Sequence, residues 1–205
     1  MEKGENMCHT FQTASTNRID SGNEVGEIKD NIKEQQVMEW YEIYYKDIYR
    51  FIFYMMGDRQ CCEDLVHDTF LRAFKSFEKF ENRTNVNTWL FSIAKYLVID
   101  EIRKRRRKRV FSLFSKDPEI QSPFNIEQYI ENKDTIERTL EAIQQLKPNY
   151  RLVITLKKIE ECSTKEIAEI LGWSESKIRK TLSRGLAALK KKNDEEGGGY
   201  FEKRL

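Results

Sequence analysis

The first half of the chain carries the apolar spacing of amphipathic helices. Three segments, 34–56, 61–78 and 87–108, repeat apolar residues every three to four positions. Gly57 directly follows the first segment, where a glycine often ends a helix. The pattern predicts three helices that pack as one small domain over residues 34–109.

Helical spacing resumes at 133–146, breaks at Pro148 and continues to about 159. Ser163 and Glu166 then have the S-x-x-E spacing of a capping box, which predicts a new helix start. Gly172 predicts a sharp turn after that helix, and Ser174 is suited to cap the next one. These elements predict a second helical domain over residues 133–192.

The remaining segments lack a stable period. Residues 1–33 are polar and are expected to be disordered, 110–132 contain two of the three prolines and are expected to form a flexible linker, and 193–205 are expected to be a flexible tail. Met38, at the start of the periodic region, is a second candidate for the first translated residue. The predicted fold class is therefore all-α, with two small helical domains joined by a flexible linker.

Composition agrees with a helical protein that remains in the cytosol. Apolar residues make up 39% and charged residues 34%, with only nine Gly. Neither a membrane span nor the apolar part of a secretory signal is visible. The four cysteines lack C-x-x-C spacing, so neither a disulfide framework nor a structural zinc is expected. Cys8 and His9 leave a metal or redox role open, beside the simpler interpretation of a free thiol.

Charge is distributed unevenly although the net charge is only +2. Residues 103–109 form an unbroken run of seven cations at the end of the third predicted helix. Such a run occurs on solvated helix ends and on membrane-facing patches, but with these flanking helices it favours a nucleic-acid partner.

The last predicted helix is apolar on one side and cationic on the other. Ile178, Leu182, Leu186 and Leu189 fall on one stripe, whereas Lys, Arg and Ser residues lie off it. A short helix, a tight turn and a cationic second helix are typical of a helix-turn-helix, whose second helix enters the DNA major groove. The alternative is a helical hairpin with a solvated lysine face.

Two longer stretches make a family resemblance specific. CEDLVHDTFLRAFKSF followed by TWLFSIAKYLVIDEIRKRRRKR resembles region 2 of the extracytoplasmic-function (ECF) group of bacterial sigma factors. LKPNYRLVITLKKIEECSTKEIAEILGWSESKIRKTLSRGLAALKK resembles their region 4. The resemblance spans roughly residues 38–192 and keeps the order of the family's parts.

The resemblance implies an RNA polymerase partner. In this family, a region 2 helix binds the clamp coiled coil of the largest polymerase subunit, and the flap is a further expected contact. The matching positions here are Asp64, His67 and Asp68. Their spacing puts all three on one helix face, and acidic groups suit a coiled coil that presents arginines. His67 stands where the family commonly has Gln.

The resemblance also implies recognition and melting of the promoter −10 element. Asn and aromatic side chains suit an unstacked base, and cations suit phosphates. Tyr96 stands where the family often has Asn, and Trp89 is expected in the core rather than as a stacking platform. The implied −10 residues are Phe80, Asn82, Arg83, Thr84, Asn85, Asn87, Thr88, Lys95, Tyr96, Arg103, Lys104 and Arg106.

Region 4 of the family reads the −35 element, and arginine can bridge two acceptors of a guanine. The linker would run toward the polymerase active-site channel. Members are usually held inactive by a membrane-associated anti-sigma factor, so such a partner is implied, without insertion of this chain into a membrane. The implied −35 residues are Lys165, Lys177, Arg179, Lys180, Ser183 and Arg184.

Two other classes of protein compete with this interpretation. An enzyme is disfavoured because the chain lacks a phosphate-binding loop, a nucleophile elbow and a zinc-protease motif, so we expect neither a catalytic residue nor a cofactor. A stand-alone transcription regulator, with residues 38–109 as a sensing or dimerising domain, remains open. It would bind specific duplex DNA tightly without polymerase.

Overall fold

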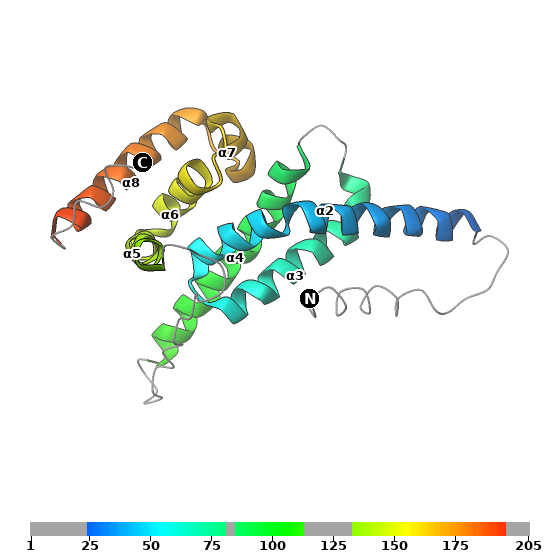
Figure 1. Ribbon diagram of the computed structural model, residues 1–205, viewed down its shortest axis with the longest axis horizontal. Helices are drawn as coiled ribbons and strands as arrows, with labels where there is room; N and C mark the ends of the chain where they lie inside the picture. Colours follow the sequence, from blue (N-terminus) through cyan, green and yellow to red (C-terminus); the bar gives the residue numbers. More distant parts are fainter. Residues whose placement is uncertain (1–23, 81–84, 113–132, 196–205) are drawn as a thin grey trace.

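The computed structural model describes residues 24–80, 85–112 and 133–195, and Figure 1 shows that the regular elements within these ranges are helices. Helices α2, α3 and α4 form a first module, and helices α5 to α8 form a second. The prediction of an all-α fold with two helical modules is confirmed.

The first module consists of α2 (Glu24–Met56), α3 (Arg59–Lys75), the short 3-10 turn η1 (Phe77–Lys79) and α4 (Val86–Ser112). Gly57 has a φ of 72° and ends α2, as its position in the sequence predicted. Asp58 then caps α3, because its Oδ1 accepts a hydrogen bond from the backbone N–H of Cys61 at 3.2 Å. These two residues reverse the chain and set α3 beside α2.

The second module consists of α5 (Lys133–Gln144), α6 (Pro148–Ile154), the π-helical turn η2 (Thr155–Ile159), α7 (Thr164–Leu171) and α8 (Glu175–Glu195). Pro148 stands in the first turn of α6, where its missing N–H costs no hydrogen bond. After η2, Glu161 has a φ of 55°, in the left-handed region that residues other than glycine adopt at a cost.

Several helices extend into segments that the sequence analysis treated as irregular. Helix α2 begins at Glu24 rather than near residue 34, α4 continues to Ser112, and α8 continues to Glu195. Adding a residue to an existing helix is easier than starting one, so polar flanks without an apolar stripe continue the helix. The rest of the expected disordered leader, linker and tail lies outside the described residues.

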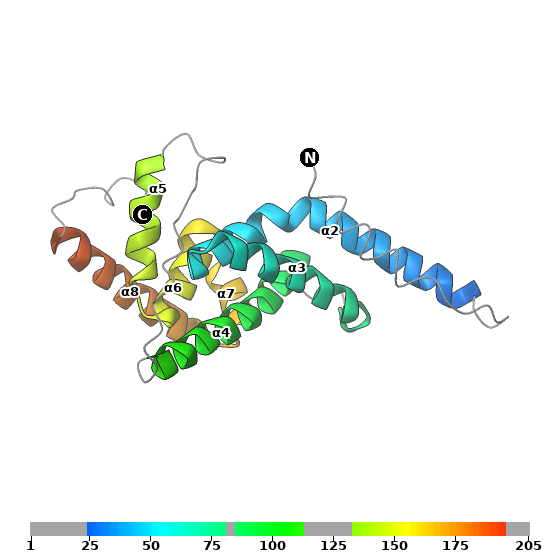
Figure 2. The ribbon, with the colours of Figure 1, turned by 90° about the horizontal axis from the view of Figure 1, so that it is seen from below.

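One hydrophobic cluster runs through both modules. It contains Phe51 of α2 and Phe91 of α4, whose rings meet edge to face with centroids 5.4 Å apart. The same cluster contains Leu152 of α6 and Ile167 of α7. Figure 2 shows α7 beside α4, and the structure therefore joins the two modules through buried apolar surface.

A smaller cluster fixes α5. Leu140, Ile143 and Leu146 pack with Ile154 of α6 and Leu189 of α8, and Tyr54 near the end of α2 completes the group. The second module is therefore built around α6, which contributes to both clusters. Helix α8 packs on α6 and on α7, and this packing orients α8, the cationic helix.

Candidate functional site

Helices α7 and α8 form the helix-turn-helix, and its local signals are as the sequence predicted. Ser163 Oγ accepts from the N–H of Glu166 at 3.1 Å, and the Glu166 carboxylate accepts from the N–H of Ser163 at 2.7 Å. These hydrogen bonds lower the pKa of Glu166. Gly172 ends α7 with a φ of 66°, and Ser174 Oγ accepts from the N–H of Lys177 at 3.3 Å. Side chains at the starts of α7 and α8 thus satisfy free backbone N–H groups of both helices.

Helix α8 has one buried side and one cationic side. Ile178 and Leu189 are almost completely buried, and Leu182 and Leu186 are partly buried. The opposite side is open to solvent. All of the expected −35 residues are exposed: Lys165 on α7, and Lys177, Arg179, Lys180, Ser183 and Arg184 on α8.

Two of these cations already have surface partners. Arg179 Nη1 lies 3.0 Å from Glu175 Oε2, and Lys177 Nζ lies 3.7 Å from the centroid of the Trp173 ring. The Arg179–Glu175 ion pair is exposed, and Lys177 is an exposed cation over a half-buried ring; surface contacts of either kind contribute only about 0–1 kcal/mol. The two side chains can therefore exchange these contacts for a DNA partner at little cost.

The acidic face expected on α3 is present. Asp64 and Asp68 are exposed and His67 is half-buried, whereas Val66 and Phe70 on the other side of the helix are buried in the core. The face lies on the first module and the cationic side of α8 lies on the second. The two candidate binding faces are therefore separate surfaces.

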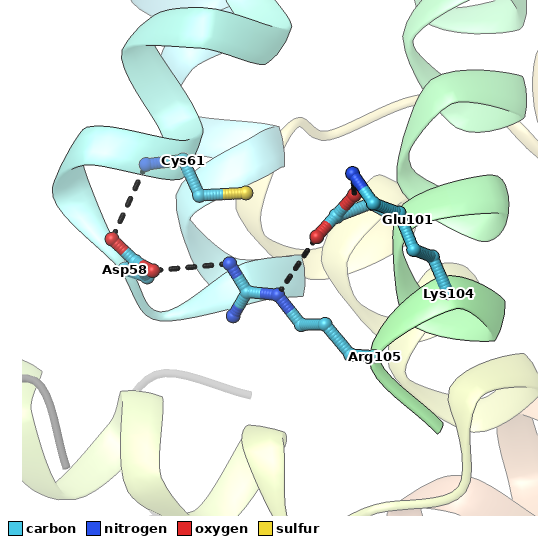
Figure 3. A network of polar contacts seen from close by, with 5 residues as sticks. All are labelled: Asp58, Cys61, Glu101, Lys104 and Arg105. Atoms are coloured by element: carbon cyan, nitrogen blue, oxygen red, sulfur yellow. Dashed lines mark hydrogen bonds and ion pairs between the residues drawn. The ribbon is translucent and has the colours of Figure 1, made fainter. Parts of the chain in front are cut away.

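The basic end of α4 divides into inward and outward cations. Arg103, Lys104 and Arg106 are exposed. Figure 3 shows Arg105 turning toward the start of α3, where its Nη2 lies 3.0 Å from Asp58 Oδ2 and its Nε lies 3.2 Å from Glu101 Oε1. The sequence analysis did not separate Arg105 from its neighbours, because the charge that holds it lies 47 residues earlier in the chain.

An aromatic cluster lies beside the loop expected to hold a −10 base. The ring centroid of Phe80 is 5.3 Å from that of Trp40 and 4.9 Å from that of Trp89. Trp89 and Phe80 are therefore packed against the core through Trp40, which is 6% exposed. The core position expected for Trp89 is confirmed, and the same packing holds Phe80 in this structure.

The other −10 candidates differ in their surroundings. Asn82, Arg83 and Thr84 lie outside the described residues. Asn85 Oδ1 accepts from the N–H of Asn87 at 3.0 Å, at the start of α4, and Thr88 is 5% exposed. Among the described residues, Oδ1 of Asn87 is one of four buried side-chain nitrogen and oxygen atoms without a hydrogen-bond partner.

Lys95 and Tyr96 are neighbours with opposite exposure. Tyr96 is 60% exposed, whereas Lys95 is 5% exposed and donates from Nζ to the carbonyl oxygen of Ile170 in α7 at 2.7 Å. Lys95 Nζ also lies 3.7 Å from the centroid of the Tyr96 ring. In this arrangement the Lys95 ammonium faces a backbone carbonyl rather than solvent, and its expected phosphate contact stays a prediction. The ammonium is shielded from solvent because α7 packs over it.

The described residues give little support for other kinds of site. Within them, no three His, Cys, Asp or Glu side chains are grouped so that they could hold a metal ion. Cys61, Cys62 and Cys162 carry free thiols, and burial raises the pKa of each. No helix in these ranges combines the length and the apolar character needed to cross a bilayer. Cys8 and His9 lie outside them.

Two family descriptions match separate parts of the chain. Residues 40–108 match Sigma-70 region 2, and residues 136–189 match Sigma-70 region 4. The first match covers α3 and nearly all of α4, and the second covers the helix-turn-helix.

Similar proteins carry both parts. The ECF RNA polymerase sigma factor SigX of Bacillus subtilis is 34% identical over 155 residues, which cover 74% of this chain and 80% of SigX. The ECF RNA polymerase sigma factor SigM of the same organism is 32% identical over 158 residues, covering 74% and 91% of the two chains.

Solved structures share the fold. The sigma factor RpoE of Bartonella quintana, in complex with the anti-sigma factor NepR, has a TM-score of 0.63 at 24% identity and covers 77% of this chain and 96% of that one. CnrH, in complex with the cytosolic domain of CnrY, has a TM-score of 0.61 at 18% identity and covers 80% and 91%. At these identities the likeness concerns the fold.

Proposed function

Because the chain belongs to the ECF sigma factors of RNA polymerase, we propose that it binds core polymerase and directs it to promoters through separate −10 and −35 contacts. In this role it supplies sequence specificity while the polymerase performs the chemistry. The proposal implies action in the cytoplasm, where the polymerase and the chromosome are.

The observation that carries the proposal is the exposed cationic side of α8. Arg179, Lys180 and Arg184 lie in solvent on a helix whose other side is buried. An arginine that reaches the major groove can donate two hydrogen bonds to a guanine, which contributes about 1–3 kcal/mol of discrimination. Lys165 and Lys177 would contact phosphates, and Ser183 would contact a base or a phosphate.

For the −10 element we propose a role for the surface around Tyr96 and the start of α4. The exposed Tyr96 ring offers a stacking surface for an unstacked base. Asn87, half-buried at the start of α4, would hydrogen-bond a base edge through its side-chain amide. Arg103, Lys104 and Arg106 would contact backbone phosphates. As the family resemblance implies, further contacts with the −10 element would come from Phe80, Asn82, Arg83, Thr84, Asn85 and Thr88.

For polymerase binding we propose the face of Asp64, His67 and Asp68 on α3. Exposed carboxylates accept charge-assisted hydrogen bonds from arginines on a partner, and two of them one helical turn apart match a coiled-coil surface. The clamp coiled coil of the largest subunit is the partner that the family uses, with the flap as a second contact for region 4.

We further propose an anti-sigma factor as regulator. The support is that a protein of the same fold, RpoE, was solved with the anti-sigma factor NepR. For this chain the partner would be associated with the membrane, as is usual in the family. Pull-down from the native host, with and without solubilised membranes, tests this part separately.

The test of the main proposal is transcription in a purified system. Bacterial core polymerase is incubated with fragments of the host genome, alone and with the purified chain, and the 5′ ends of the transcripts are sequenced. We expect new start sites that share two upstream elements and that depend on both components. Tight, specific duplex binding by the chain alone, with no start sites after polymerase is added, would instead identify a stand-alone regulator.

A further inference from the structure

Helix α8 carries one carboxylate at the start of its cationic stretch. Within residues 170–193 of the sequence Glu175 is the only acidic residue, and it stands in the first turn of α8. Its side chain is 46% exposed. A carboxylate beside DNA is repelled by the phosphates. On a helix that enters the major groove, Glu175 therefore weakens binding unless a group on the DNA donates to it.

Glu175 is joined to a cation one turn later in the helix. Arg179 donates from Nη1 to Oε2 of Glu175 at 3.0 Å. An arginine side chain has five N–H donors, and this contact uses one of its nitrogens. Arg179 can therefore donate from Nε and Nη2 to a guanine while the ion pair with Glu175 is kept.

The ion pair sets a donor and an acceptor side by side where α8 would meet the bases. In a helix-turn-helix, the N-terminal residues of the second helix contact base edges. Neighbouring bases on a strand are about 3.4 Å apart along the DNA axis. The two paired atoms of Arg179 and Glu175 are separated by a similar distance, 3.0 Å. Arg179 and Glu175 can therefore contact neighbouring bases at the same time.

We propose that Glu175 is a specificity-determining residue, which accepts a hydrogen bond from the amino group of a base next to the guanine that Arg179 contacts. The inference rests on the proposed function, in which α8 reads the −35 element. In the major groove cytosine presents the N4 amino group and adenine the N6 amino group, whereas guanine and thymine present acceptors. Glu175 thus selects cytosine or adenine at this position of the strand that it faces, and rejects guanine and thymine.

The proposal differs in a measurable way from a purely structural ion pair. Removal of the Glu175 carboxylate takes away both the acceptor for an amino group and the repulsion of guanine and thymine, so the preference at one base position weakens. The preference for the guanine remains, because Arg179 keeps its own donors. If Glu175 served only to hold Arg179, its removal would weaken the preference for the guanine and leave the neighbouring position unchanged.

Transcription from randomised promoters tests this difference. Promoters with every sequence at the −35 element, each linked to a downstream barcode, are transcribed by core polymerase with the full chain, and the barcodes are sequenced. Arg179→Ala identifies its guanine as the position at which the preference for guanine disappears. Beside that position, we expect wild type to favour cytosine or adenine about fivefold over guanine and thymine.

The deciding variant is Glu175→Ala. At the neighbouring position its preference should fall to about twofold or less, while the preference for the guanine is kept. Glu169→Ala is the matched control, because Glu169 is an exposed carboxylate on α7 outside the expected −35 residues, and it should keep both preferences. Glu175→Gln retains an acceptor oxygen and gains an amide donor, so it should tolerate all four bases at the neighbouring position.

The same data separate this inference from the proposed function. If wild type selects a −35 sequence but Glu175→Ala selects the neighbouring base equally strongly, the role of Glu175 is wrong while the function stands. Loss of only the guanine preference in Glu175→Ala would likewise overturn it, in favour of a positioning role. If wild type shows no preference at any −35 position, the proposed −35 contact itself fails.

Discussion

Asp58 and Arg105 join the beginning of α3 to the basic end of α4, with Oδ2 of one 3.0 Å from Nη2 of the other. Asp58 uses its second oxygen to cap α3, so one carboxylate organises both helices (Figure 3). Arg105 is thereby separated from the cations beside it that face solvent. Within the run of seven cations, Arg105 therefore has a structural role.

Asp58→Ala should destabilise the protein by about 1–2 kcal/mol, because it removes a helix cap as well as the partner of Arg105. Urea denaturation monitored by circular dichroism measures the effect. Asp58→Ser is the control, since serine can keep the cap without the charge and should recover most of the loss. Equal stability of the Ala variant and wild type would show that neither contact matters.

The buried carboxylate Glu160 should make stability depend on pH. Burial raises its pKa to about 7, against the opposing effect of Arg50. A pKa raised on folding gives stability that is complete below the unfolded pKa, about 4.5, and is lost as the pH rises through about 7. Unfolding free energies of wild type and Glu160→Gln, measured from pH 5 to 8, should show wild type losing stability relative to the variant. Parallel profiles would contradict the assignment.

Glu161 adopts a left-handed backbone conformation with a φ of 55° directly before the helix-turn-helix. Glycine adopts this conformation without strain, so Glu161→Gly should stabilise the protein by about 0.5–1 kcal/mol. Glu161→Ala keeps the strain and serves as control. Thermal unfolding of both variants measures the difference, and a Gly variant less stable than the Ala variant would argue against strain.

Tyr96 should contribute to binding of the melted −10 strand through its exposed ring. Base stacking on an aromatic side chain is worth about 1–3 kcal/mol, so Tyr96→Ala should weaken binding of the polymerase complex to forked promoter DNA about fivefold or more. Tyr96→Phe keeps the ring and should bind as wild type does. Binding is measured by fluorescence anisotropy, and loss of affinity in the Phe variant would assign the effect to the hydroxyl instead.

Mutations on α8 and on α3 should impair different activities, −35 recognition and core binding respectively. Arg179→Ala should reduce transcription from promoters with an intact −35 element by about 10-fold or more while core binding is unchanged. Asp64→Ala should weaken core binding while duplex contacts are kept. Lys190→Ala on α8 and Glu42→Ala on α2 are exposed charge controls. Equal loss of both activities in each variant would contradict the division proposed here.

Local signals predicted the elements well because they act within a few residues. The capping box of Ser163 and Glu166 and the turn glycines Gly57 and Gly172 depend only on neighbours, and each is found as expected. The exposed side of α8 followed from helical spacing alone.

Contacts between distant residues could not be predicted in this way. The sequence predicts Lys95 to be a surface cation, yet its hydrogen-bond partner is a backbone carbonyl 75 residues away. Glu160 and Arg50 are 110 residues apart and show no local pattern. Any residue can supply a backbone carbonyl, so no residue type in the sequence marks such an acceptor. An ion pair between the two modules follows no helical spacing either, and both contacts are therefore visible only in the packed structure.

The three tryptophans give the protein its own optical probes. Trp40 and Trp89 lie in one aromatic cluster with Phe80, and Trp173 lies beside the amino-terminal turn of α8. Emission from the first two should report on strand opening, and quenching of the third on major-groove contact. Replacing either set by phenylalanine would let a single stopped-flow experiment assign the order of the two events without an added dye.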